Sequence, residues 1–196
     1  MRDEFYADHR DLWKWTEVLK AAGESKKILY VAMLRPDTPN RSQPAGVAPR
    51  VWKFFEEEWR SLNAERKCSR ITRLSARIEP VFDNYSYRDR HEYFGRVAES
   101  LRSRPEGERH VVFLDPDTGI GGGRPGDKHV SVEQIGSVWD AMREGDLLLI
   151  YQHNARVKQT EWVKDRISKM AAATGKLESE ITSCSVADVC FLKLTK

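Results

Sequence analysis

Apolar and polar residues follow one another along the chain in a pattern that predicts buried strands alternating with helices. Three short runs are almost continuously apolar, which is typical of strands buried on both faces of a parallel sheet: Ile28–Leu34, Val111–Leu114 and Leu147–Tyr151. Between these runs, apolar residues recur at helical spacing. They predict helices over residues 8–22, 50–63, 87–102, 131–143 and 157–173.

Two further regions complete the prediction. Residues Ile71–Glu79 alternate enough for a strand that Pro80 would end, and Ile181–Leu194 reads as two strands joined near residues 187–188. Alternating strands and helices predict a three-layer, Rossmann-like α/β fold with a mostly parallel sheet and a C-terminal antiparallel hairpin. The 196 residues suit a single domain, 1–196.

The segment Arg35–Pro49 is predicted to be a mobile loop. It contains four prolines and no apolar periodicity that would dock it on the rest of the domain. Long loops in compact domains are usually either mobile or functional. We therefore expect this segment to exchange its amide protons faster than the buried strands.

Composition narrows the class of protein. No apolar run approaches the ~20 residues that cross a bilayer, and the mixed-charge start MRDEFYADHR is unlike a signal peptide. The three cysteines show no CxxC spacing, which favours a reducing cytoplasm over a disulfide scaffold. The net charge is only +3, but six basic residues and one acidic residue fall within Arg60–Arg77. Such a cluster suits phosphate, although solvated helix faces carry similar runs.

Candidate chemistry lies where the buried runs end, because ligands of open α/β sheets bind outside the carboxyl ends of the strands. Three short polar segments occupy these positions. Their candidate residues are Arg35 and Asp37 after the first run, Asp115, Asp117, Thr118 and Gly119 after the second, and Gln152, His153 and Asn154 after the third. Asp37 and Asp117 could instead be turn residues without a functional role. His153 could instead be a hydrogen-bonded residue at the rim of the sheet.

Asp115 is the strongest of these candidates. It is the first polar residue after a buried strand, and the following Pro116 fixes the direction in which the chain leaves. The glycines from Gly119 to Gly126 would let backbone approach a ligand closely. The chain has neither a GxGxxG motif after the first strand nor a GxxxxGK[ST] motif. The chain therefore lacks the sequence signatures of the common NAD and ATP sites.

The chain resembles the adenine methyltransferases of large-subunit ribosomal RNA. Their opening Asn/Gly-x-x-Asp-x-x-Lys helix is similar to Ala7-Asp8-His9-Arg10-Asp11-Leu12-Trp13-Lys14, and their Asp-Pro-Pro-Tyr strand end to Asp115-Pro116-Asp117-Thr118. The motifs ADxxDLxKW, FLDPDTGI and LLIYQH also resemble those of a bacterial and phage group of unassigned activity with a DPD(T/N)G motif. The resemblance covers most of the chain in order and implies a methyltransferase-type fold.

The resemblance implies an enzyme that acts on nucleic acid or a nucleotide with S-adenosylmethionine. Asp115 would then hold an exocyclic amine or ribose, and Asp8, Asp11 and Lys14 would form one wall. The chain departs from the family in three places, one of which is Asp117 in place of the second proline of the Asp-Pro-Pro-Tyr motif. Arg35–Pro39 has no glycine where the family has its cofactor loop, and Thr118 replaces the aromatic residue that stacks on the base.

Two alternatives remain open. Asp115 and Asp117 could bind Mg²⁺ or Mn²⁺ in a nuclease or phosphodiesterase, with His153 or His129 as ligand or base and Lys128 on the phosphate. The chain could also be a non-catalytic binding module on the same scaffold. For the first two hypotheses, we expect one cavity at the carboxyl edge of the sheet. The residues expected to converge there are Asp8, Asp11, Lys14, Asp115, Asp117 and His153.

Overall fold

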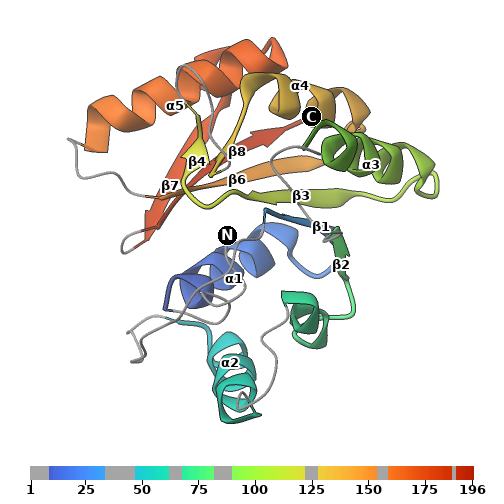
Figure 1. Cartoon of the computed structure of the whole chain (residues 1–196), viewed down its shortest axis with the longest axis vertical. Helices are drawn as coiled ribbons and strands as arrows, with labels where there is room; N and C mark the ends of the chain where they lie inside the picture. The colour runs from blue at the N-terminus through green and yellow to red at the C-terminus, as the bar shows by residue number, and fades with distance from the viewer. Residues whose placement is uncertain are drawn as a thin grey trace.

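The sheet at the centre of the molecule has six strands and is mostly parallel (Figure 1). The computed structural model describes residues 9–33, 47–61, 68–81, 90–121, 128–153, 159–186 and 189–196. The strand order is β2-β1-β3-β6-β8-β7. The bounds are β1 (Lys27–Ala32), β2 (Ile78–Val81), β3 (His110–Asp115), β6 (Leu147–His153), β7 (Thr182–Val186) and β8 (Val189–Thr195).

The direction of the strands agrees with the sequence prediction. The neighbours β2, β1, β3 and β6 are all parallel, and β8 pairs antiparallel with both β6 and β7. The three buried apolar runs are therefore neighbouring parallel strands, and the C-terminal hairpin is antiparallel, as expected. Because β8 lies between β6 and β7, β7 runs in the same direction as the parallel strands.

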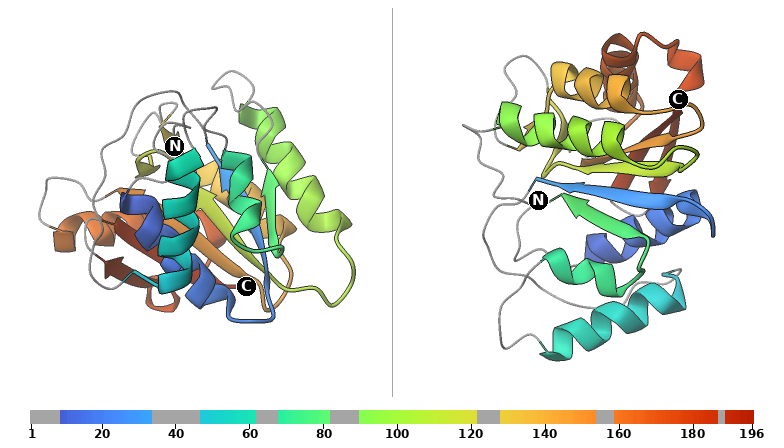
Figure 2. Two further views of the ribbon diagram at one scale, coloured as in Figure 1. Left: turned by 90° about the horizontal axis from the view of Figure 1, so that it is seen from below. Right: turned by 90° about the vertical axis from the view of Figure 1, so that its right-hand side faces the viewer.

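Helices cover both faces of the sheet, as the two views of Figure 2 make clear. One face packs against α1 (His9–Ala22) and α2 (Pro49–Ser61), and we call it the α1 face. The other face packs against α3 (Arg90–Ser103), α4 (Val132–Ala141) and α5 (Gln159–Thr174). Each of the five predicted helices is present, and each begins and ends within three residues of the prediction in the described part of the chain. No helix in the described ranges is long and apolar enough to cross a membrane.

The predicted strand Ile71–Glu79 is wrong in its first part. Residues Cys68–Arg73 form a short 3₁₀ helix, η2, and the strand β2 begins only at Ile78. Ile71 and Leu74 are both buried, and a 3₁₀ helix puts residues three apart on the same side. Pro80 does not end β2 but lies within it, which is tolerated because β2 is an edge strand.

The structure also contains elements that the sequence did not predict. A two-stranded parallel ribbon, β4 (Gly119–Ile120) with β5 (His129–Val130), follows β3, and a short 3₁₀ helix η3 (Glu178–Glu180) precedes β7. The ribbon leads into α4, whose start is fixed by a capping box. The Ser131 hydroxyl accepts from the Gln134 amide, and the Gln134 side chain accepts from the Ser131 amide.

The connections leaving β1 and β3 go to opposite faces of the sheet. After β1 the chain returns through α2 on the α1 face, whereas after β3 it continues through β4, β5 and α4 on the opposite face. β1 and β3 are direct neighbours. In open α/β sheets this divergence makes the carboxyl ends of the two strands the preferred place for a ligand.

The opposite, amino edge of the sheet is closed by a buried ion pair. The Asp146 carboxylate accepts hydrogen bonds from the Arg104 guanidinium and from the backbone amides of His110 and Arg143. Arg104 also contacts His110 Nδ1 at 3.1 Å, and His110 Nε2 lies 3.3 Å from a Glu79 carboxylate oxygen. These contacts join the starts of β3 and β6 to the end of α3.

His110 should make the fold sensitive to mild acid. Burial is the largest influence on its pKa and lowers it from the usual 6.5; the positive Arg104 lowers it further, whereas Glu79 and Asp146 oppose the shift. The unfolded chain therefore binds the proton more readily than the native protein. Stability should decline as the pH falls below 6.5, by at most about 1.4 kcal/mol per pH unit for one proton.

Urea unfolding between neutral and mildly acidic pH measures this dependence. His110→Gln should reduce the loss of stability on acidification, while the same change at His91, which is exposed on α3, should leave the loss intact. An identical pH dependence in wild type and His110→Gln would exclude His110 as its source.

Candidate functional site

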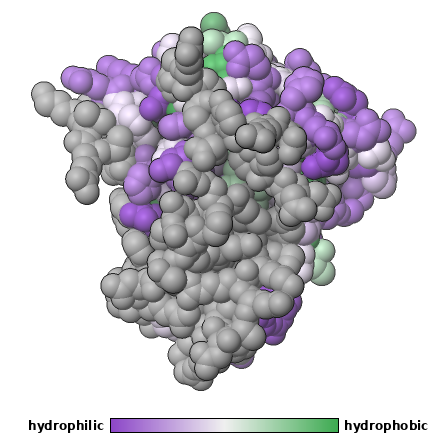
Figure 3. Space-filling view, in the orientation of Figure 1, coloured by the Kyte–Doolittle hydropathy of each residue, from purple (hydrophilic) through white to green (hydrophobic). Residues whose placement is uncertain are grey.

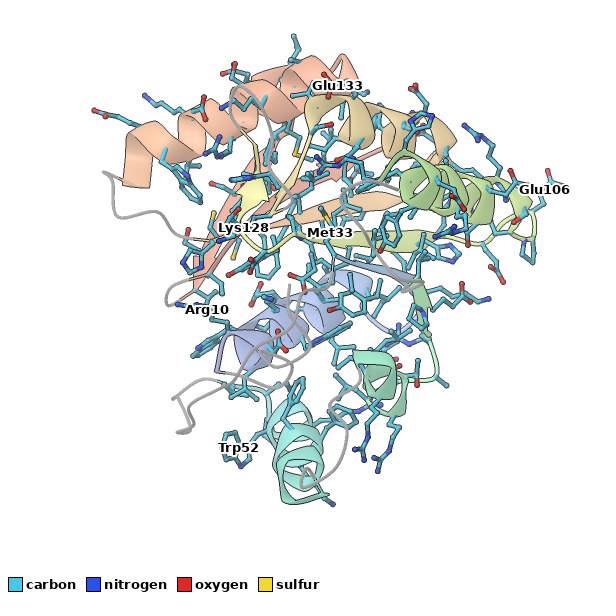
Figure 4. The ribbon with its side chains drawn as sticks, in the orientation of Figure 1. Arg10, Met33, Trp52, Glu106, Lys128 and Glu133 are labelled. Carbon is cyan, nitrogen blue, oxygen red and sulfur yellow. The ribbon has the colours of Figure 1, made fainter. Side chains whose placement is uncertain are left out.

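Asp115 is the last residue of β3 and lies at the carboxyl edge between the diverging connections. Its exposure is only 1%. Val111 and Phe113 of the same strand pack on the α1 face, and alternate residues of a strand point to the same side. Asp115 therefore points to the α1 face. Figure 4 shows this part of the molecule, with Met33 labelled just beyond the end of the neighbouring strand β1.

Lys14 of α1 reaches across the sheet edge to this carboxylate. Its Nζ lies 3.0 Å from Asp115 Oδ1 and 3.3 Å from Oδ2. The same ammonium lies 3.2 Å from Asp11 Oδ1, one helical turn earlier. All three side chains are buried. The predicted convergence of Asp11, Lys14 and Asp115 is therefore present in the structure, with a lysine held between two carboxylates.

Tyr30 is a member of this cluster that the sequence analysis did not identify. Its hydroxyl donates to Asp115 Oδ2 at 3.0 Å. In the parallel register Tyr30 lies opposite Phe113, so its ring points to the same face as Asp115. The ring stacks on Phe113 and contacts the edge of Trp15. The sequence signal that could have identified Tyr30 is a tyrosine, with its polar hydroxyl, two residues before the end of a buried apolar strand.

Tyr151 links the cluster to His153. Lys14 Nζ lies 4.2 Å from the centre of the Tyr151 ring, a favourable cation–π distance. The Tyr151 hydroxyl is 3.2 Å from His153 Nδ1. His153 is two residues after Tyr151 on β6 and half-buried, so it shares the α1 face with Asp115. Asp115 and His153 therefore face the same side of the sheet, as expected, and Tyr151 lies between Lys14 and His153. The cavity expected at this edge stays a prediction.

Gln152 lies on the other face of the sheet from this cluster. Its Oε1 accepts from the Ile120 amide at 3.0 Å and ties the β4–β5 ribbon to β6. Its buried Nε2 has no hydrogen-bond partner among the described residues. Gly119 has a φ of +107°, and an added Cβ would overlap the Gln152 side-chain amide. Glycine is therefore required at position 119 by both the backbone conformation and the contact.

The remaining described candidates belong to the ribbon. Both the amide and the hydroxyl of Thr118 donate to the Lys128 carbonyl at 3.0 Å. The Lys128 side chain is exposed, while Asp117 and His129 are half-buried. Thr118 and Lys128 therefore have a clear structural role in closing the ribbon. Within the described ranges, no three His, Cys, Asp or Glu side chains are grouped closely enough to hold a metal ion.

Some of the predicted site lies outside the described residues. This applies to Asp8, Arg35, Asp37 and Asn154, and to the predicted mobile loop Arg35–Pro49 up to Gly46. The described end of that segment is ordered helix, because α2 begins at Pro49.

Among the described residues, the cluster brings one lysine between two aspartates. Asp11, Lys14 and Asp115 are each at most 5% exposed. Ions at this depth are screened much less than surface pairs. Carboxylate oxygens in this environment can accept from a ligand that presents a hydrogen-bond donor or a positive group.

Comparison with known proteins gives no family for the chain: no protein-family model matches it, and no curated protein sequence is significantly similar.

Proposed function

We propose that this protein is a methyltransferase-like enzyme with a Rossmann-like fold that acts on nucleic acid or a nucleotide. The observation that carries the proposal is the position of Asp115. It is a buried carboxylate directly before a proline, at the carboxyl end of the strand beside β1, where the connections diverge. The methyltransferases that the sequence resembles have their Asp-Pro motif at the corresponding point in the order of elements.

The described residues can bind the amine or hydroxyl group of a nucleotide. Asp115 Oδ1 contacts Lys14 Nζ and retains lone-pair directions with which it can accept from an amine or hydroxyl. Lys14 and Tyr30 hold the carboxylate in place from two different elements. S-adenosylmethionine would supply the methyl group when bound. Asp115 would orient the amine that receives it, and accurate orientation of reacting groups is a major source of rate enhancement.

The metal-dependent alternative is less well supported by this geometry. A cation at Asp115 would have to displace or approach the Lys14 ammonium, 3.0 Å from the carboxylate oxygen. Two positive charges at such distances repel strongly in a buried site. If the protein is a binding module without catalysis, the same cluster would bind the ligand, but no reaction would follow.

The experiment is a methyl-transfer assay with radiolabelled S-adenosylmethionine. Mixed single-stranded RNA, single-stranded DNA and free nucleotides serve as acceptors, since a base inside a duplex must first be extruded. We expect transfer to at least one acceptor. Asp115→Asn should reduce the rate by about 100-fold, because it removes the charge that orients the acceptor.

The matched control is Asp140→Asn, the same chemical change at an exposed position of α4, which should keep the wild-type rate. Circular dichroism at the assay temperature verifies that both variants are folded. If hydrolysis of the nucleic acid appears instead, requires Mn²⁺ and stops with chelator, the metal-dependent hypothesis replaces this one. Binding without either reaction supports the non-catalytic module.

A further inference from the structure

The net positive charge of this protein comes from one segment of the sequence. Residues 49–77 contain eight basic and four acidic residues, a net charge of +4, whereas the whole chain carries +3. The other 167 residues are therefore slightly acidic in total. A local excess of this kind attracts a partner of the opposite sign and speeds its encounter.

The two described helices of this segment, α2 and η2, lie on the α1 face of the sheet. Helix α2 lies beyond α1, and η2 lies next to α2, between it and the edge strand β2, in the views of Figures 1 and 2. Arg50 joins them, because its guanidinium donates to the Leu74 carbonyl at 2.7 Å. A carbonyl is a neutral acceptor, so this contact orients Arg50 without cancelling its charge.

Basic side chains occupy the outer side of both helices. On η2, Ile71 and Leu74 are buried, and the three-residue turn places Arg70 and Arg73 together on another side. Arg73 is exposed and Arg70 half-buried, and both also interact with other residues of the chain. On α2, Val51 and Phe54 are buried, whereas Arg50 and Lys53, also three residues apart, are exposed. Figure 3 shows strongly hydrophilic residues where η2 lies. We call Arg50, Lys53, Arg70 and Arg73 the basic surface.

We propose that the basic surface binds the phosphate backbone of a single-stranded nucleic acid. Three of its four residues are arginines, whose planar guanidinium groups can each make two parallel hydrogen bonds to a phosphate. Exchange of condensed counterions for such contacts supplies most of the sequence-independent affinity for nucleic acids. The inference rests on the proposed function and extends it. It assigns a binding surface to the phosphate backbone of the nucleic acid that would accept the methyl group.

The location suits that role. The basic surface and the Asp115 side chain are on the same face of the sheet, so one strand of nucleic acid can follow the surface while a base is presented toward the carboxyl edge. A lipid surface fits less well. Among the described residues, Leu177 is the only exposed large apolar side chain, and it precedes η3 on another part of the molecule. Peripheral membrane helices normally insert apolar side chains as well as basic ones.

Fluorescence anisotropy with labelled single-stranded RNA and DNA of mixed sequence tests the proposal without a methyl donor. We expect Arg70→Gln/Arg73→Gln to raise the Kd at least tenfold. The slope of log K against log salt should fall by about 1.4, the value for two phosphate contacts on a single strand. Lys53→Gln/Arg73→Gln should raise the Kd to a similar extent. This second variant tests the same surface if the first one does not fold.

The control is Arg102→Gln/Lys164→Gln, which removes two exposed positive charges from the opposite side of the sheet. It should change the Kd less than threefold. Equal weakening by all variants would mean that only net charge matters, and binding to anionic phosphatidylserine vesicles but not to nucleic acid would identify a lipid partner; each overturns the inference. If nucleic acid binds as expected but no methyl transfer occurs, the basic surface stands and the proposed activity fails.

Discussion

Replacing Asp146 with alanine is expected to lower the free energy of unfolding by about 3–5 kcal/mol, the cost of breaking a buried ion pair. Asp146 has no exposed surface. The variant would leave the Arg104 guanidinium buried without its carboxylate partner, and two backbone amides without their acceptor. Each buried polar group left unsatisfied adds a desolvation penalty.

Urea unfolding followed by circular dichroism measures this loss. The control is Asp140→Ala on the exposed side of α4, which should change the free energy of unfolding by no more than about 0.5 kcal/mol. Asp146→Asn should fall between the two, because the amide oxygen still accepts one hydrogen bond but no longer neutralises Arg104. A loss below about 1 kcal/mol for Asp146→Ala would show that water replaces the carboxylate at little cost.

The fold was predictable to the extent that burial leaves a pattern in the sequence. The strands β1, β3 and β6 are buried on both faces and therefore read as continuous apolar runs. β2 was misplaced because it is short and at the edge, where neither a run nor strict alternation is required. The ribbon β4–β5 has only two residues in each strand, which is too short for a periodic pattern, and most of its hydrogen bonds are between backbone atoms.

The candidate site was predictable where a charged residue interrupts an apolar pattern. Asp115 follows a buried strand, and Asp11 with Lys14 lies in a helix that otherwise packs against the sheet. Tyr30 and Tyr151 were missed because a tyrosine within an apolar strand looks like core. Only the three-dimensional arrangement shows that their hydroxyls contact Asp115 and His153 and that the Tyr151 ring contacts Lys14.

Replacing Lys14 with methionine is expected to be the most damaging single change within the candidate site. Methionine matches the length of the lysine stem but carries no charge. It would leave Asp11 and Asp115, each 1% exposed, as two buried carboxylates without the ammonium between them. Removing one partner of a buried ion pair costs about 3–5 kcal/mol of stability.

The matched control lies on the same helix. Lys20 pairs with Glu17, also three residues away, but its side chain is 64% exposed. Exposed pairs contribute at most about 1 kcal/mol, so Lys20→Met should have a small effect on urea unfolding. The contrast between two lysine-to-methionine changes in one helix isolates the effect of burial from that of helix propensity.

A double-mutant cycle tests whether Lys14 acts through Asp115. Asp115→Asn alone should cost about 1–3 kcal/mol, since Lys14 keeps Asp11 as a partner and Tyr30 keeps an oxygen acceptor. When Lys14 is already methionine, replacing Asp115 with asparagine removes a carboxylate that has lost its cation. The second change should then be neutral or stabilising. The double variant should therefore lose less free energy of unfolding than the sum of the two single losses, by at least about 1 kcal/mol. Additive effects would mean that Lys14 and Asp115 stabilise the fold independently, in which case Lys14 does not hold the Asp115 carboxylate in position for a ligand.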